Sequence, residues 1–198
     1  MQELSLSQSA LLTDLAYCVN RYRLFTPGIY VCVHASVELE EGTRLVPGLV
    51  AMVNHGRLKQ CEATEDGFVG PPNFVLDVFK ESEMEDYEKR WAAFAAGGVI
   101  EYVAVTEAPS GEVRCLWNRH DGASFERIDP DEDGVIKSKA LPGLWFYSEK
   151  LQDRDWWAIG DLIDRGISRL GHHEFMETIW HKKGRDPKWG DWLPFESG

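Results

Sequence analysis

The stretch NFVLDVFKESEMEDYEKRWAAFAAGGVIEYVAVT, residues 73–106, decides the fold of this chain. It begins with a short apolar run over 73–79 and ends with a β-branched run over 99–106, and both patterns are typical of strands. The residues between them have the spacing of an amphipathic helix. Because a helical crossover returns the chain in the same direction, we expect the two strands to be parallel neighbours, or near neighbours, in one sheet.

The helix of this unit has its own start and stop signals. Ser82 and Glu85 have the S-x-x-E spacing of a capping box, in which the two residues satisfy free N–H groups at a helix start. Gly97 and Gly98 end the pattern. Apolar residues at helical spacing give the helix one apolar face, made of Met84, Tyr87, Trp91 and Phe94.

The flanking segments extend the sheet and supply further helices. A helical stripe and two β-branched runs lie upstream, and a Pro-Ser-Gly turn at 109–111 marks a hairpin downstream. In chain order we predict a helix over 4–23, strands over 29–37 and 43–53 (the second interrupted at Pro47-Gly48), a polar loop over 54–71, a hairpin of 99–106 with 112–117, a strand pair around 124–128 and 134–139, and helices over about 154–168 and 172–183.

This order predicts an α/β fold with a mixed β-sheet core flanked by helices and with extra C-terminal helices. A length of 198 residues suits one domain better than two. We therefore expect a single domain at residues 1–183, with terminal helices over 153–183, and an irregular tail at residues 184–198.

Composition limits the classes of function. The net charge of -12 argues against a broad electrostatic grip on nucleic acid, although it leaves room for a local basic groove. No apolar run approaches the roughly 18 residues of a membrane span, and the N-terminus lacks the pattern of a signal peptide. The cysteines form no C-x-x-C pair, so we expect reduced thiols and a cytoplasmic protein rather than a zinc site or a disulfide framework.

Asp77 is the first candidate for chemistry. It lies within the predicted strand 73–79, where Val75 and Phe79 share its face and the other face is also apolar. Both faces are therefore expected to be buried. A buried carboxylate is costly unless it meets a metal ion, a cation or several donors, so we interpret Asp77 as a site residue. The alternative is a structural aspartate that accepts backbone N–H groups.

Arg90 is the second candidate, on the helix that follows Asp77. At 100° per residue Arg90 lies at the edge of the apolar face, whereas Lys89 lies almost opposite and is expected to be solvated. Arg90 can thus approach the strand. The alternative is a surface arginine whose aliphatic stem lies along the helix.

Three other features resemble sites, and we interpret each as structural. Residues 129–134, DPDEDG, begin like a calcium loop, but the twelfth position is Ala140 instead of Glu, so we predict an acidic turn. His172 and His173 are adjacent and point in different directions on a helix, so we predict a solvated helix start. Five tryptophans could stack bases, but they are more typical of a core or a dimer interface: Trp156, Trp157, Trp180, Trp189 and Trp192.

Taken together, these segments resemble the Uma-type family of restriction endonucleases, within the PD-(D/E)XK superfamily, over about residues 10–180. PPNFVLDV (71–78) is similar to the family's second acidic strand, P-D-L-V-V-E-V. DYEKRWAAFAAGGVIEYVAV (86–105) resembles its helix and next strand. IKSKALPGLWF (136–146) and LIDRGISRLGHHEFMETI (162–179) resemble its late strand and terminal helices. The resemblance implies a restriction-endonuclease-like core, DNA as partner and Mg²⁺ as cofactor.

The chain departs from the family pattern at the residues that matter most. The first catalytic Asp of the family corresponds to Gly48, and its second acid, usually Glu, is Asp77. The usual strand Lys corresponds to Phe79, and the family's helix Lys corresponds to Arg90, which cannot lose its proton. By resemblance Asp77 would bind Mg²⁺ and Arg90 would steady the phosphate. Further acids that could compensate for Gly48 are Glu38, Glu40 and Glu101.

Two hypotheses follow. The first is a metal-dependent DNA endonuclease with a shifted site, in which water is the nucleophile. The second is a catalytically degenerate homologue, a pseudoenzyme that serves as a binding or scaffolding module and that could form a homodimer. Gly48 and the net charge of -12 favour the second hypothesis.

Overall fold

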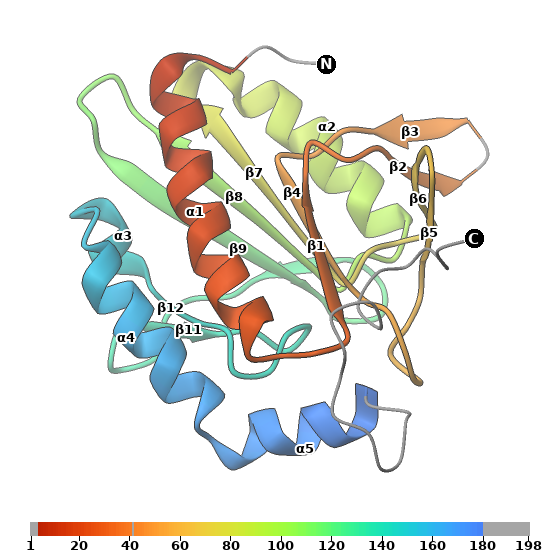
Figure 1. The fold of residues 1–198 in the computed structure, drawn as a ribbon. Helices are drawn as coiled ribbons and strands as arrows, with labels where there is room; N and C mark the ends of the chain where they lie inside the picture. Colours follow the sequence, from red (N-terminus) through yellow and green to blue (C-terminus); the bar gives the residue numbers. More distant parts are fainter. Residues whose placement is uncertain (1–3, 41, 180–198) are drawn as a thin grey trace.

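A computed structural model describes residues 4–40 and 42–179 of the chain. Its central mixed sheet has six strands in the order β1-β4-β7-β8-β9-β10 (Figure 1). β7 and β8 are parallel, with Asp77 opposite Ala104, which confirms the strand–helix–strand prediction. The other neighbours in this sheet are antiparallel. The strands are β1 (Ile29–Val33), β4 (Leu49–Val53), β7 (Phe74–Lys80), β8 (Glu101–Glu107), β9 (Val113–His120) and β10 (Phe125–Arg127).

Helices cover both faces of this sheet, so the predicted α/β class is confirmed. α1 (Leu6–Leu24) and α4 (Trp156–Ile167) pack on one face, and α2 (Met84–Ala96) packs on the other (Figure 1). The sheet thereby separates two apolar clusters. α5 (Leu170–Ile179) follows α4 and is one of the expected C-terminal helices. No helix in the described part of the chain is long and apolar enough to cross a membrane.

α1 forms where the sequence predicted it. Ser5 caps its start by accepting a hydrogen bond from the backbone N–H of Gln8. The stripe of Leu11, Leu15, Cys18 and Tyr22 is fully buried against the sheet.

The first predicted strand is interrupted in the structure. β1 ends at Val33, and His34 adopts a left-handed backbone with φ of 51°. The chain then leaves the central sheet and enters a second, four-stranded sheet of order β3-β2-β6-β5. The predicted loop over 54–71 is also partly wrong, since it contains two of these short strands. The sheet comprises β2 (Val37–Glu40), β3 (Thr43–Leu45), β5 (Glu62–Thr64) and β6 (Gly67–Val69).

The predicted capping box of Ser82 and Glu85 is wrong. A single 3-10 turn, η1 (Glu81–Glu83), precedes α2, and the Glu83 carboxylate accepts the backbone N–H of Lys80. Glu85 pairs instead with Lys89, 2.8 Å away on the surface. The helical segment therefore starts two residues earlier than the S-x-x-E spacing indicated.

The C-terminal part follows the predicted elements with two changes. The strand pair around 124–128 and 134–139 is not formed, because β10 pairs with β9 whereas β11 (Val135–Lys137) pairs with β12 (Trp145–Tyr147). A short helix, α3 (Ser148–Gln152), precedes α4. The predicted extension of the last helix to 183, the tail 184–198 and three of the tryptophans (Trp180, Trp189 and Trp192) lie outside the described residues.

His172 is buried, which contradicts the predicted solvated helix start. Only 3% of it is exposed, and its ring packs edge-on against Tyr22. Thr26 Oγ1 donates to the Tyr22 carbonyl and therefore accepts from His172 Nε2, at 2.9 Å. The other ring nitrogen, Nδ1, is buried without a hydrogen-bond partner among the described residues. Burial, with a further contribution from His173, lowers the pKa of His172 below its ordinary value of 6.5.

This burial predicts a loss of stability in mild acid. The unfolded chain takes up the His172 proton at higher pH than the folded chain, so stability falls as the pH drops through about 6.5. We expect a lower midpoint of thermal unfolding at pH 5.5 than at pH 7.5, and a smaller difference for His172→Gln. The exposed His55 provides the matched control, His55→Gln, which should keep the full difference. An unchanged difference in His172→Gln would contradict the assignment.

Candidate functional site

Asp77 is buried, and both of its carboxylate oxygens accept hydrogen bonds. It is 5% exposed, in the middle of β7. One carboxylate oxygen, Oδ1, accepts the backbone N–H of Gly48 at 2.7 Å. The other, Oδ2, accepts the Tyr102 hydroxyl at 3.1 Å and Arg90 Nη1 at 3.3 Å. A backbone group, a hydroxyl and a guanidinium therefore replace the water that this carboxylate would have at the surface.

The fold explains why these groups meet. Asp77 projects from the same face of β7 as Val75 and Phe79, which belong to the apolar cluster beneath α2. The Arg90 side chain extends from α2 towards β7, and its Nη1 also donates to the Val46 carbonyl, at 3.1 Å. The expected proximity of Arg90 and Asp77 is therefore present in the structure.

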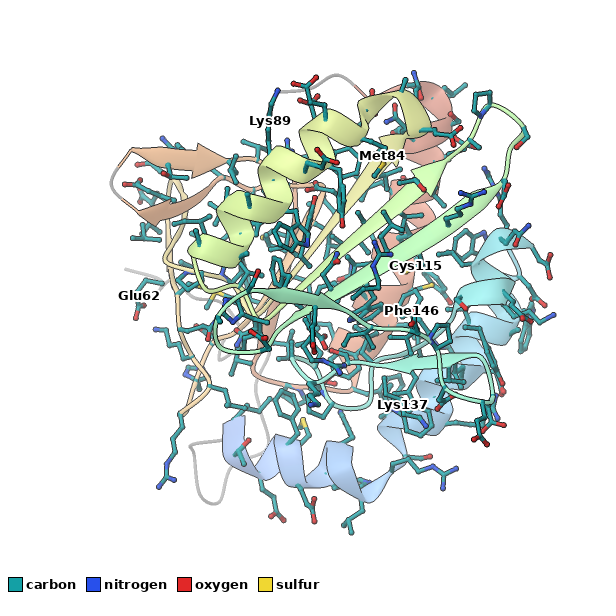
Figure 2. All side chains as sticks on the ribbon, turned by 180° about the vertical axis from the view of Figure 1, so that it is seen from behind. Glu62, Met84, Lys89, Cys115, Lys137 and Phe146 are labelled. Carbon is teal, nitrogen blue, oxygen red and sulfur yellow. The ribbon has the colours of Figure 1, made fainter. Side chains whose placement is uncertain are left out.

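Lys89 lies elsewhere, also as expected. Figure 2 shows it on the outer side of α2, pointing away from the sheet, where it pairs with Glu85 at 2.8 Å. Its side chain is 66% exposed. Lys89 therefore supplies no charge to Asp77.

Burial dominates the electrostatics of Asp77. It raises the pKa of Asp77 above the ordinary value of 3.8, and the Arg90 charge, the Gly48 N–H and the Tyr102 hydroxyl act in the opposite direction. Burial and the Asp77 charge also raise the pKa of Tyr102, which keeps its hydroxyl protonated as a donor. The three donors thus offset part of the desolvation of the carboxylate.

Gly48 has little room for a side chain. A Cβ atom there would lie 3.1 Å from Leu12 Cδ1 and 3.1 Å from the Leu76 carbonyl oxygen. Leu12 belongs to α1, which is anchored in the core, and the Leu76 oxygen is backbone. A side chain at the position that, by resemblance, corresponds to the family's first catalytic Asp would therefore require Leu12 and the Leu76 carbonyl to shift.

The cavity beside Asp77 is small. Its volume is about 20 Å³, and Leu4, Leu12, His34 and Arg90 are among the residues that line it. Such a volume holds about one water molecule. His34, with its left-handed backbone, is a residue of this site that the sequence did not indicate.

Glu101 does not compensate for Gly48. It is fully buried on the opposite face of the sheet, because it alternates with Tyr102 along β8. There it accepts Arg119 Nε at 2.8 Å, the Ser138 hydroxyl and the backbone N–H of Lys139. These contacts hold the segment after β11 against the sheet, so Glu101 is a structural anchor.

Glu38, the second proposed acid, forms no hydrogen bond or ion pair with Asp77 among the described residues. Glu38 lies on β2 of the second sheet. Glu40 ends the same strand, and its side chain is not described.

The residues around Asp77 do not fit Mg²⁺. Magnesium in proteins takes oxygen ligands in near-octahedral geometry, with one or two carboxylates as anchors. Here both Asp77 oxygens already accept hydrogen bonds and the nearest charge is the Arg90 cation. Within residues 4–40 and 42–179, no group of three or more His, Cys, Asp or Glu side chains could hold a metal ion.

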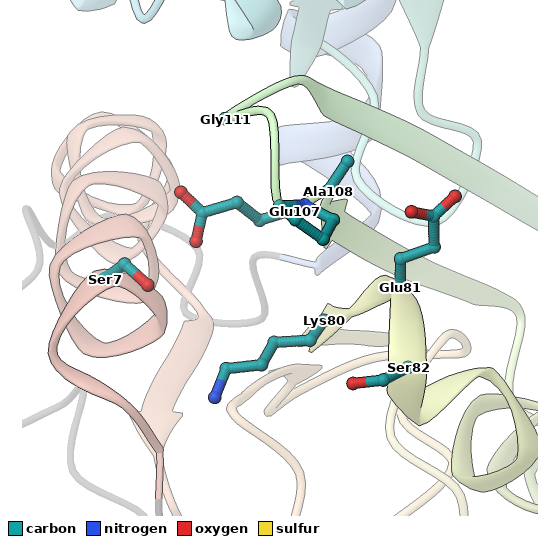
Figure 3. A pocket seen from close by; sticks show the side chains of 8 residues that line it. Ser7, Lys80, Glu81, Ser82, Glu107, Ala108 and Gly111 are labelled. Carbon is teal, nitrogen blue, oxygen red and sulfur yellow. The ribbon is translucent and has the colours of Figure 1, made fainter.

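A wider hollow lies at the carboxyl ends of β7 and β8, the usual location of ligand sites beside parallel strands. Figure 3 shows Lys80 extending between α1 and Ser82, with Ser7 and Glu107 also in the lining. The hollow has a volume of about 620 Å³. Lys80 lies three residues after Asp77, roughly 10 Å further along the strand.

The charges around this hollow are mixed. Glu107 pairs with Arg154 at 2.6 Å, while Glu81 adds a second carboxylate to the lining. Lys80 is exposed and forms no ion pair within the described residues. The hollow therefore offers one available cation rather than a broad basic surface.

Three contributors to the site were not predicted. Tyr102 faces Asp77 because the parallel pairing places Tyr102 opposite Val75, on the same face of the sheet. The alternation of strand 99–106 could have indicated this hydroxyl. The residue pattern does not indicate the roles of the Gly48 N–H and the His34 backbone. Both roles depend on the place where the chain passes between the central sheet and the second sheet.

Of the comparisons with known proteins, the one with solved structures finds a protein of similar fold. No family model matches the chain. No curated protein matches its sequence. One similar solved structure is the crystal structure of a "putative nuclease belonging to DUF820" from Anabaena variabilis ATCC 29413, with a TM-score of 0.52 and 9% identity over 82% of this chain and 84% of that chain. The likeness shows that this chain shares the fold of that protein.

The Asp77 contacts predict a graded response to substitution. Asp77→Ala leaves the half-buried Arg90 charge and two donors without their acceptor, so we expect a loss of about 3–5 kcal/mol in the free energy of unfolding. Asp77→Asn keeps an acceptor oxygen and should lose less. Urea unfolding measures both, with the exposed Asp86→Ala as a control that should change by under about 0.5 kcal/mol. Equal losses for Ala and Asn would argue against the charge pair.

Proposed function

We propose that this chain is a non-catalytic binding module built on a nuclease-like fold. The observation that carries the proposal is the state of Asp77, whose two oxygens accept Gly48, Tyr102 and Arg90. Three of the roughly four acceptor positions of this carboxylate are therefore used by protein donors, and one of those donors is the positively charged Arg90. Gly48 also lacks the second ligand that the family resemblance would supply.

The protein is in this view a pseudoenzyme of nuclease ancestry. The proposal rests on the resemblance of residues 71–78 and 86–105 to the acidic strand and helix of restriction endonucleases, and on the nuclease-like fold. Ancestry of this kind explains why a carboxylate stands in an apolar strand at all. Four free thiols are consistent with a cytoplasmic location, which we propose with it.

DNA is the partner that this ancestry suggests. The net charge of -12 restricts contact to a local groove, and the hollow around Lys80 is the candidate. Lys80, with the Ser7 and Ser82 hydroxyls, suits one backbone phosphate. Glu81 and Glu107 disfavour a longer run of phosphates across the same surface.

The alternative is a metal-dependent DNA endonuclease that uses a shifted site. The nuclease-like fold and the hollow around Lys80, at the carboxyl end of the strand that carries Asp77, favour it. Fold likeness is an analogy, however, and the donors around Asp77 oppose the alternative. The two functions differ in a single measurable property, cleavage that depends on Asp77.

A cleavage assay separates the two. Supercoiled and single-stranded DNA are incubated with the full chain and Mg²⁺ or Mn²⁺, beside Asp77→Ala and an active nuclease as positive control. We expect no cleavage above background for either form of the chain, and no metal-dependent rise in its thermal midpoint. Cleavage that disappears in Asp77→Ala would establish the endonuclease instead.

DNA binding is tested separately, by fluorescence anisotropy of a short labelled single strand. We expect weak binding that Lys80→Gln weakens, with a slope of log K against log salt that is smaller by about 1. Lys89→Gln is the matched control, since Lys89 lies on the outer side of α2. If the wild-type chain does not bind, or if both variants bind alike, the hollow is not the DNA site.

A further inference from the structure

A groove between α1 and α4 remains outside the site described above. Tyr17 and Arg21 of α1 line it, together with Trp156, Trp157 and Gly160 of α4, and its volume is about 330 Å³. This volume is within the roughly 300–1,000 Å³ range of sites that enclose a bound group. It is ample for one aromatic side chain.

Trp157 stands at this groove with its indole in solvent. It is 86% exposed, and Tyr17 across the groove is 55% exposed. An aromatic side chain of this size buries about 150–250 Å² when it packs, and most of this area of Trp157 is exposed to solvent in the single chain. Exposed aromatic side chains gathered at one place are typical of protein interaction surfaces.

Like the exposed Trp157, Gly160 is a residue of this groove that is unfavourable for the single chain. It lies inside α4, where glycine is disfavoured relative to alanine. The packing of the single chain does not require it, because a Cβ atom there would meet only the Arg21 side chain, at 3.7 Å. The missing side chain therefore keeps the groove open.

The floor of the groove is held in place. The Arg21 guanidinium donates to Asp164 through Nε, at 2.8 Å, and through Nη2. It also donates to the Tyr17 hydroxyl, at 3.2 Å, through Nη1. These contacts orient Tyr17 before any partner arrives, which lowers the entropy that binding would otherwise lose.

We infer that this groove binds a second copy of this chain, with Trp157 of each protomer inserted against Tyr17 and Gly160 of the other. Trp157 and Gly160 are three residues apart, so the projection and the hollow lie on neighbouring turns of one helix face. A surface that carries both is self-complementary under a two-fold axis. The inference is independent of the proposed function.

The charge of the groove surface favours a second copy of the chain over other kinds of partner. The chain carries a net charge of -12, so two copies repel each other unless they meet through a locally neutral surface. Both acids of the groove lining are paired with an arginine, Asp164 with Arg21 of the lining and Asp161 with Arg165 beside the groove, so the surface is locally neutral. A basic peptide would prefer a net acidic surface, and the acids disfavour nucleic acid.

The size of the contact predicts a weak dimer. Trp157 and Tyr17 together would bury about 300–500 Å² on each protomer, taking about 150–250 Å² for each ring. A stable interface buries about 800 Å² per partner. We therefore expect a dimer that dissociates on dilution through the micromolar range.

Sedimentation velocity of the full chain, from about 1 to 200 μM, tests this inference. We expect a shift from monomer to dimer with rising concentration. Trp157→Ala should weaken association about 30-fold, the usual effect of truncating a central aromatic residue. Gly160→Leu should abolish the dimer by filling the groove, while its urea unfolding at 1 μM shows that the protomer remains folded.

Phe25→Ala is the matched control, because Phe25 is an exposed aromatic residue outside this groove. It should dimerise like the wild-type chain. A wild-type chain that remains monomeric up to 200 μM overturns the inference, as does a dimer that forms equally well in Trp157→Ala or in Gly160→Leu.

Discussion

The compensation of the buried Asp77 carboxylate is the constraint on which the arrangement of this site depends. Moving a carboxylate out of water costs several kcal/mol, by order of magnitude, unless donors replace its hydration. Here the donors come from three different segments: Gly48 before β4, Arg90 on α2 and Tyr102 on β8. Each of these segments must therefore keep its position relative to β7, and the small cavity at Asp77 follows from that requirement.

A second buried carboxylate, on the other face of the sheet, is also compensated by hydrogen-bond donors. Glu101 is fully buried and accepts Arg119, Ser138 and a backbone N–H, as Asp77 accepts Arg90, Tyr102 and a backbone N–H. Glu101 does not occupy the position of the family's strand acid, yet its surroundings are chemically alike. This parallel supports the interpretation that Asp77, too, now serves as an anchor between elements, whatever its ancestry.

The sequence predicted the parts that depend on local periodicity. The strand–helix–strand unit, α1 and the approach of Arg90 to Asp77 follow from spacings of 2 and 3.6 residues. The break at His34 could not be predicted, because it depends on the pairing of β1 and β2 with strands of two different sheets that come later in the chain. His172 was wrongly placed in solvent, since its burial depends on packing against Tyr22 and Thr26, about 150 residues earlier. The predicted capping box is wrong because a 3-10 turn precedes the helix, so the acid that caps is Glu83, on the N–H of Lys80, and Glu85 pairs with Lys89.

Under the proposed nuclease ancestry, Gly48 connects the missing metal ligand with the packing of the fold. It has no side chain to serve as a ligand, its N–H donates to the Asp77 carboxylate, and its small size lets Leu12 of α1 pack against the strand. An aspartate at position 48 would have to displace Leu12 and move away from the Leu76 carbonyl before it could face Asp77. Arg90 would still hold a permanent positive charge at the place where a divalent cation would bind, because a guanidinium does not deprotonate. Packing, hydrogen bonding and charge therefore oppose a metal ion together, and a single substitution would not restore the site.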